Sequence, residues 1–214
     1  DSNEGFFSTL PPETGEVGPY QGKVADVNWR VLPNYKNLCV LNVDSAVTPD
    51  DQAVVFLANQ ITTKKKREAN LLVGASGSYK IWLNGVLVGT REENTGLLLD
   101  NDAWKVTLAT GENNLLIKLA SGQGTGLDMV VRLVDKDMKP LETSGFNAKW
   151  AGTPTEAAPA TLPTLGPNGG LAQAKRLATS GVSAEAVWGA WLWSRLDLRN
   201  AATPWRDIAD KLDR

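Results

Sequence analysis

The chain of 214 residues contains no histidine. This absence excludes Ser-His-Asp triads, Cys-His pairs, histidine metal sites and histidine pH switches. An enzyme built from this sequence would need carboxylates, lysine or tyrosine for its chemistry. We therefore expect a protein that has no catalytic residues and binds no metal or cofactor.

Cysteine is nearly absent as well, and Cys39 is the only one in the chain. No disulfide can form within the chain, which argues against a secreted disulfide scaffold. Because Cys39 lies in the apolar run Leu38–Leu41, we expect a small buried hydrophobic side chain there.

Long apolar runs and an excess of charge are also missing. No stretch approaches the ~20 apolar residues that cross a bilayer, so we expect no membrane span. The net charge of −2 gives no reason to expect nucleic acid or an anionic membrane as a partner. The chain starts with polar residues and shows no signal peptide. We interpret this start as a trimmed N-terminus and expect a periplasmic or exported protein.

The strongest local pattern is a β-hairpin in the middle of the chain. Asn84-Gly85 separates the apolar runs Tyr79–Leu83 and Val86–Val88. Both turn residues tolerate the positive φ angles of a type I′ turn. Tyr79, Ile81 and Leu83 alternate with polar or outward positions, so one face of the hairpin is expected to be buried.

Further stretches rich in β-formers surround this hairpin, with turn residues between them. Together they predict about eight strands at short spacing, which is typical of a β-sandwich or barrel. The additional predicted strands are Val24–Leu32, Gln52–Thr62, Leu71–Val73, Trp104–Leu108, Asn114–Ala120 and Leu127–Val134. Before them, residues 1–23 are expected to form a loop-like arm held in place by Phe6 and Phe7.

Three polar segments between strands each allow a structural and a functional interpretation. Lys64–Arg67 is either a solvated hairpin tip or a patch for a polyanion. Asp100-Asn101-Asp102 is either a turn or a source of calcium ligands. Ser121–Gly126 is either a glycine-rich turn or a phosphate loop, although it lacks the Gly-Lys-Ser/Thr ending of such loops. In each case the structural interpretation is the one we adopt.

The composition changes after residue 150. Residues 151–170 are rich in Pro, Ala, Thr and Gly and predict a semi-extended linker. From residue 171 the apolar period becomes helical, with one helix at Leu171–Ala178 and a second that starts at Ser183. Thr203-Pro204 signals a third helix, whose apolar face is Trp205, Ile208, Ala209 and Leu212. These helices either dock on the β-domain or begin a longer helical array, and Trp188, Trp191 and Trp205 are the predicted partner surface.

Aromatic side chains are the usual platforms for sugars. The four candidates, Trp29, Tyr79, Trp82 and Trp104, all lie inside predicted strands, where burial is the more common outcome. Polar ligand contacts are expected from the loops between strands. The predicted ligand-binding residues are Arg91, Glu92, Asn94 and Gln123.

The order of these segments resembles that of galactose-binding-like jelly-roll domains. The resemblance rests on Asn3–Glu13, Leu71–Val88, Gly111–Gly124 and Asp128–Asp135. It is similar in particular to the accessory modules of large bacterial proteins with transglutaminase-like domains and tetratricopeptide arrays. Ile81–Gly85, Arg91 and Gly111–Lys118 occupy the places of that group's "V-W-L-N-G" strand, arginine loop and "G-x-N-x-L-L-x-K" segment.

In two respects the chain departs from this family pattern. The pattern often has two acidic residues after "G-S", where this chain has Ser76-Gly77-Ser78. It also usually has a further strand before Asn3-Glu4-Gly5, which suggests that the chain is part of a longer protein.

The resulting prediction is a mainly β protein with three parts. We expect a jelly-roll β-sandwich at 1–150, a linker at 151–170 and a short helical segment at 171–214. The predicted function is a non-catalytic accessory module that contacts glycan, a protein partner or the rest of a larger polypeptide. The alternative is a structural or interaction fragment that uses the tryptophan-rich helices.

Overall fold

The computed structural model describes residues 4–22, 25–32, 40–45, 47, 53–122, 126–142, 145–148, 150, 152, 169–179, 183–197, 202 and 205–206. The predictions for Cys39, for Gln123, for Ile208, Ala209 and Leu212, and for nearly all of the 151–170 linker lie outside these residues. The described part is mainly β, with a small C-terminal helical segment, as the sequence predicted.

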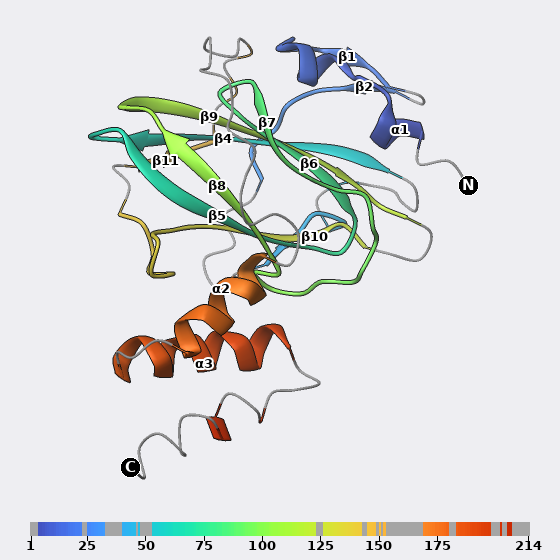
Figure 1. Ribbon diagram of the computed structural model, residues 1–214. Coiled ribbons are helices and arrows are strands. Elements are labelled where there is room, and N and C mark those ends of the chain that lie inside the picture. Colours follow the sequence, from blue (N-terminus) through green and yellow to red (C-terminus); the bar gives the residue numbers. More distant parts are fainter. Residues whose placement is uncertain are drawn as a thin grey trace.

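Two antiparallel sheets face each other and form a β-sandwich (Figure 1). The five-stranded sheet contains, in spatial order, β11 (Gly145–Asn147), β4 (Val54–Thr63), β9 (Gly111–Ala120), β6 (Ser78–Leu83) and β7 (Val86–Arg91). The four-stranded sheet contains β3 (Leu41–Asn42), β10 (Asp128–Val134), β5 (Arg67–Ala75) and β8 (Asp102–Leu108). A small third sheet pairs β1 (Tyr20–Gln21) with β2 (Asp26–Val27).

The hairpin between β6 and β7 confirms the strongest local prediction. Asn84 and Gly85 both have positive φ angles, 51° and 80°, as a type I′ turn requires. The strands pair from Leu83–Val86 to Tyr79–Arg91, with one irregularity between Ile81 and Trp82. The turn residues therefore set the register of this edge of the sandwich.

The core lies between the two sheets and follows the period of two along each strand. In β5, Leu71, Val73 and Ala75 face inward, whereas Leu72 belongs to a different cluster on the outer side. Burying each such aliphatic side chain contributes about 1.5–3 kcal/mol. The inward residues contributed by the five-stranded sheet include Ile61, Tyr79, Ile81, Leu115, Ile117 and Leu119.

Consecutive strands mostly belong to opposite sheets, and this corrects one prediction. Lys64–Lys66 joins β4 to β5, but these strands lie in different sheets and do not pair with each other. The basic run is therefore a connection between the sheets and not a hairpin tip. Its three lysine side chains are exposed, in keeping with a solvated corner.

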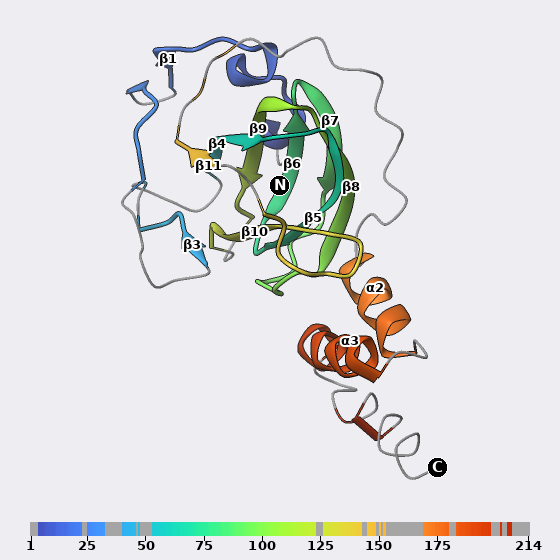
Figure 2. The ribbon, with the colours of Figure 1, turned by 90° about the vertical axis from the view of Figure 1, so that its left-hand side faces the viewer.

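The N-terminal arm lies on the outer side of the five-stranded sheet (Figures 1 and 2). It contains the short helix α1 (Glu4–Phe7) and a 3₁₀ turn at Pro11–Thr14. Phe6 is fully buried and holds the arm, as predicted, whereas Phe7 is 60% exposed. Within the described part of the predicted strand Val24–Leu32, β2 covers only Asp26–Val27, where it pairs with the two residues of β1, so the predicted strand is too long.

Two helices pack on the outer face of the four-stranded sheet, opposite the arm (Figure 1). They are α2 (Gly169–Ala178) and α3 (Ser183–Leu196), close to the predicted ranges. Leu72, Val134 and Met138 of the β-domain pack there against Leu177 and Leu192. The helices therefore dock on the sandwich. Among the described residues, no helix is long and apolar enough to span a membrane.

Candidate binding surfaces

Arg91 was predicted to lie in a loop and to contact a ligand, but its position in the fold differs. It is the last residue of β7 and is only 4% exposed. Its Nη1 donates to Asp102 Oδ2 at 2.9 Å, and its Nη2 donates to the carbonyl of Ala75 at 2.5 Å. The prediction of a loop position was therefore wrong, because the guanidinium forms its hydrogen bonds inside the sandwich.

Tyr79 and Trp104 join Arg91 and Asp102 in a buried polar network. The Tyr79 hydroxyl donates to Asp102 Oδ2 at 2.6 Å and accepts from Trp104 Nε1 at 2.9 Å. Burial, together with the nearby Asp102 carboxylate, raises the pKa of Tyr79 well above its usual range. Tyr79 and Trp104 are thus core residues and offer no ring face to a sugar.

The two aspartates of the run Asp100–Asp102 also form ion pairs with arginine side chains. Asp102 pairs with Arg91, and Asp100 forms an ion pair with Arg132. Among the described residues, no three Asp, Glu, Cys or His side chains are grouped so that they could hold a metal ion. These contacts favour the interpretation of the run as a turn.

Glu92 and Asn94, the other described residues of the predicted ligand set, follow β7 and are exposed. Asn94 Oδ1 accepts from the backbone N–H of Ser78 at 2.9 Å, and the carbonyl of Glu92 accepts from the Ser78 hydroxyl at 2.7 Å. Their main structural role is therefore to hold the start of β6. They follow the buried Arg91 in the chain, so two of the three described residues of the predicted ligand set are exposed.

A buried lysine under the N-terminal arm was not anticipated. Lys118 of β9 has a fully buried side chain, and its Nζ donates to the carbonyl of Ser8 and to Glu13 Oε1, both at 2.6 Å. Burial lowers the pKa of Lys118, and the Glu13 contact partly opposes this effect. The only signal in the sequence was a lysine within the apolar run Leu115–Ala120.

Three aromatic rings gather where the arm meets the end of the β-domain. Trp29 lies 5.8 Å from Trp150 and 6.4 Å from Tyr20, measured between ring centroids. Trp29 Nε1 donates to the Tyr20 hydroxyl at 2.9 Å, and Trp150 Nε1 donates to the carbonyl of Glu16 at 3.3 Å. All three rings are partly exposed. We call Tyr20, Trp29 and Trp150 the aromatic cluster.

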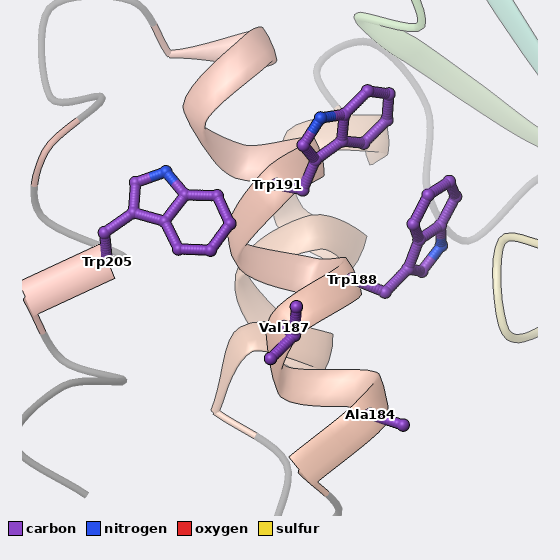
Figure 3. Close-up of a pocket in the computed structure, with 5 residues that line it drawn as sticks. All are labelled: Ala184, Val187, Trp188, Trp191 and Trp205. Atoms are coloured by element: carbon purple, nitrogen blue, oxygen red, sulfur yellow. The ribbon is translucent and has the colours of Figure 1, made fainter. Parts of the chain in front are cut away.

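A second apolar surface lies along α3 (Figure 3). It is a shallow groove of about 350 Å³, here called the tryptophan groove. Trp188 and Trp191 stack at 5.0 Å with an angle of 12° between their planes, and Trp205 points toward α3 from a separate segment. The residues that line the groove are Ala184, Val187, Trp188, Trp191 and Trp205.

The three tryptophans predicted as a partner surface are thus brought together. Trp191 and Trp205 are each 41% exposed, and the Arg195 guanidinium lies 5.6 Å from the centroid of the Trp191 ring. A cation over a ring face adds a favourable electrostatic contact. It also places a positive charge at one end of an otherwise apolar groove.

Comparison with known proteins gives only remote likenesses. No family model matches the chain, and no curated protein matches it. A crystal structure of beta-glucosidase from Kluyveromyces marxianus is 20% identical, with a TM-score of 0.32, and the match covers 38% of this chain and 11% of that chain. The PA14 domain of the antifreeze protein MpAFP is 17% identical, with a TM-score of 0.30, and the match covers 47% of this chain and 45% of that one. At these scores neither likeness supports a ligand or an activity.

Proposed function

We propose that this protein is a non-catalytic accessory module that binds carbohydrate through the aromatic cluster. The observation that carries the proposal is the grouping of Tyr20, Trp29 and Trp150 as partly exposed rings. Aromatic ring faces combine a large apolar area with a specific geometry, which suits the C–H faces of a pyranose ring. The resemblance at Leu71–Val88, Gly111–Gly124 and Asp128–Asp135 supports the further proposal that the module serves a larger bacterial protein.

The cluster is held in place before any ligand arrives. Glu16 anchors two of its rings, because its carbonyl accepts hydrogen bonds from the Tyr20 hydroxyl and from Trp150 Nε1. Trp29 is fixed in turn by its own bond to Tyr20. Side chains that are already ordered lose little conformational entropy on binding, which favours affinity.

Polar residues neighbour Trp29 in the chain. Asn28 and Arg30 flank Trp29 in the chain and both are exposed. An amide and a guanidinium supply the hydrogen-bond donors and the acceptor that sugar hydroxyls need. We therefore assign stacking to Trp29 and Trp150, and hydroxyl contacts to Asn28 and Arg30.

The non-catalytic part of the proposal rests on where the perturbed ionisable groups lie. Tyr79 and Lys118 are the buried groups with shifted pKa values, and both are hydrogen-bonded to other parts of the protein. Catalytic acids and bases normally combine a shifted pKa with access to a substrate cleft. In the described residues these two shifts accompany structural ion pairs and hydrogen bonds instead.

The test is a glycan array probed with the full chain and with three variants. We expect binding by the wild type, loss of binding in Trp29→Ala and Trp150→Ala, and unchanged binding in Phe146→Ala. Phe146 is the matched control, because it is a 63% exposed aromatic residue that lies outside the cluster. A silent array, or binding that survives both tryptophan substitutions in variants with a wild-type melting curve, would refute the proposal.

A further inference from the structure

The N-terminal arm carries two fixed points that lie close together in the chain. The first is Glu13, whose Oε1 accepts from the Nζ of the fully buried Lys118 at 2.6 Å. The second is Glu16, whose carbonyl accepts from the Tyr20 hydroxyl and from Trp150 Nε1. Only two residues separate the two glutamates, so a short piece of backbone joins the buried lysine to the aromatic cluster.

This short piece belongs to the hydrogen-bonded 3₁₀ turn of the arm. The Glu16 N–H donates to the carbonyl of Pro11 at 3.2 Å. Thr14 Oγ1 donates to the same carbonyl at 2.8 Å and to Glu16 Oε1 at 3.1 Å. Glu13 lies inside the turn, and its Oε1 also accepts from the Leu10 N–H at 3.0 Å. Because coupling between two sites is carried by hydrogen-bonded elements of this kind, a displacement of Glu13 also displaces Glu16.

The arm also contacts the segment that contributes Trp150. A Cβ added at Gly152 would lie 2.2 Å from Val17 Cγ2 and 2.7 Å from the carbonyl oxygen of Gly15. The backbone two residues after Trp150 therefore approaches the arm very closely, next to the glutamate that binds the Trp150 indole. The place of Trp150 in the cluster thus depends on the position of the arm.

The charges on the five-stranded sheet explain what holds the arm there. Lys118 of β9 lies directly opposite Lys80 of β6, and like charges in this arrangement destabilise a sheet. The arm supplies Glu13 to Lys118, and it supplies the Phe6 ring, whose centroid lies 4.8 Å from Lys80 Nζ. Both lysines therefore favour the docked position of the arm.

We propose that Lys118 and Glu13 are positioning residues for the aromatic cluster, and that the cluster forms only while the arm is docked on the sheet. Without their ion pair the arm leaves the sheet, and Tyr20 and Trp150 lose the carbonyl of Glu16 as their shared acceptor. This inference rests on the proposed function in one respect, since it makes a docked arm a requirement for sugar binding.

The test follows the indole N–H signals of the full chain by two-dimensional ¹H–¹⁵N NMR spectroscopy. Trp29→Phe and Trp150→Phe identify the two signals of the cluster. Both signals should move in Glu13→Gln, because Trp150 loses its acceptor and Trp29 loses the neighbouring ring. The Trp104 signal should stay in place, because its indole donates to the buried Tyr79 hydroxyl.

Two further variants separate positioning from a general loss of structure. Glu68→Gln is the matched control, since it makes the same change in an exposed ion pair with Lys105, and it should move none of these signals. Glu13→Gln/Lys118→Met leaves no buried charge and should return the cluster signals toward their wild-type positions. The proposal is overturned by cluster signals that stay in place in Glu13→Gln, that do not return in the double variant, or that move together with the Trp104 signal.

A glycan array lets the two proposals fail separately. Binding by the wild type should be lost in Glu13→Gln and kept in Glu68→Gln. If both glutamine variants bind as the wild type does, the cluster does not need the arm, and this inference fails while the proposed function stands. If the wild type is silent, the proposed function fails, and the NMR signals still decide whether Glu13 and Lys118 position the cluster.

Discussion

Tyr79 and Asp102 share a hydrogen bond of 2.6 Å between two side chains that are both fully buried. Tyr79 belongs to β6 of the five-stranded sheet and Asp102 to β8 of the four-stranded sheet. The bond therefore connects the two layers of the sandwich. Arg91, also from the five-stranded sheet, makes a second connection of the same kind at 2.9 Å.

Replacing Tyr79 by phenylalanine should weaken this connection. Tyr79→Phe leaves Trp104 Nε1 without its acceptor and removes one donor from Asp102. We expect a loss of about 1–3 kcal/mol in the free energy of unfolding, measured by urea denaturation at pH 7. Tyr20→Phe is the control, because its hydroxyl lies nearer the surface; an equal loss in both variants would contradict the role assigned to Tyr79.

The same hydroxyl predicts a pH effect. The pKa of Tyr79 is raised in the folded state, whereas an unfolded tyrosine releases its proton near pH ~10. Above that pH the unfolded state binds fewer protons than the folded state, so the free energy of unfolding should fall as the pH rises. Urea denaturation at several pH values from about 9 to about 11, on either side of ~10, measures this fall. The free energy of unfolding should fall less with pH in Tyr79→Phe than in the wild type, and identical slopes would refute the linkage.

Removing the charge of Glu13 should release the N-terminal arm. Glu13→Gln leaves the buried Lys118 ammonium without its carboxylate partner, and breaking a buried ion pair in this way costs about 3–5 kcal/mol. Limited proteolysis should then cut within residues 4–16. The double variant Glu13→Gln/Lys118→Met should recover most of the stability, and an arm that is no more sensitive in Glu13→Gln than in the wild type would count against this contact.

Gly189 of α3 should tolerate no side chain. A Cβ there would lie 2.1 Å from the backbone nitrogen of Ala178 and 2.6 Å from the Cβ of Leu177. Gly189→Ala should therefore force α2 and α3 apart and cost about 1–3 kcal/mol. Gly145→Ala is the matched control, because nothing lies within 4 Å of its added Cβ; equal melting temperatures for the two variants would show that the helices do not approach this closely.

Deleting residues 169–214 should destabilise the β-domain. The deletion uncovers Leu72, Val134 and Met138 on the four-stranded sheet. A loss on the order of 3 kcal/mol corresponds to a fall of about 6–12 °C in melting temperature. A scan of the truncated protein by circular dichroism measures this fall, and an unchanged transition would mean that the helices are independent of the sandwich.

Local features were predictable from the sequence because neighbouring residues determine them. Asn84-Gly85 predicted the β6–β7 hairpin. The change to a helical period predicted the first residues of α2 and α3 to within two positions. The position of each strand in the two sheets was not predictable in this way. Val54 pairs with Ala120, for example. Nothing in the sequence of either segment indicates that the two strands are partners.

The candidate sites show the same limit. Trp188 and Trp191 share one helix face, so their grouping followed from the helical period. Tyr20 and Trp29 belong to the same N-terminal segment, but Trp150 lies far from them in the chain, and only the folded structure brings it to Trp29. The prediction placed Arg91 in a loop, whereas it is the last residue of β7. A shift of one residue in the strand boundary decides whether its guanidinium faces the core, where it binds Asp102.

The distance along the chain between β4 and β9 has a consequence for synthesis. The ladder between these strands can be completed only after Ala120, the partner of Val54, has been synthesised, 66 residues later. At ribosomal rates this interval lasts on the order of 3–13 s. During it, β4 carries Phe56, Leu57 and Ile61 on a strand whose longest ladder partner has not yet been made. The nascent chain therefore passes through an aggregation-prone period that the finished sandwich no longer has.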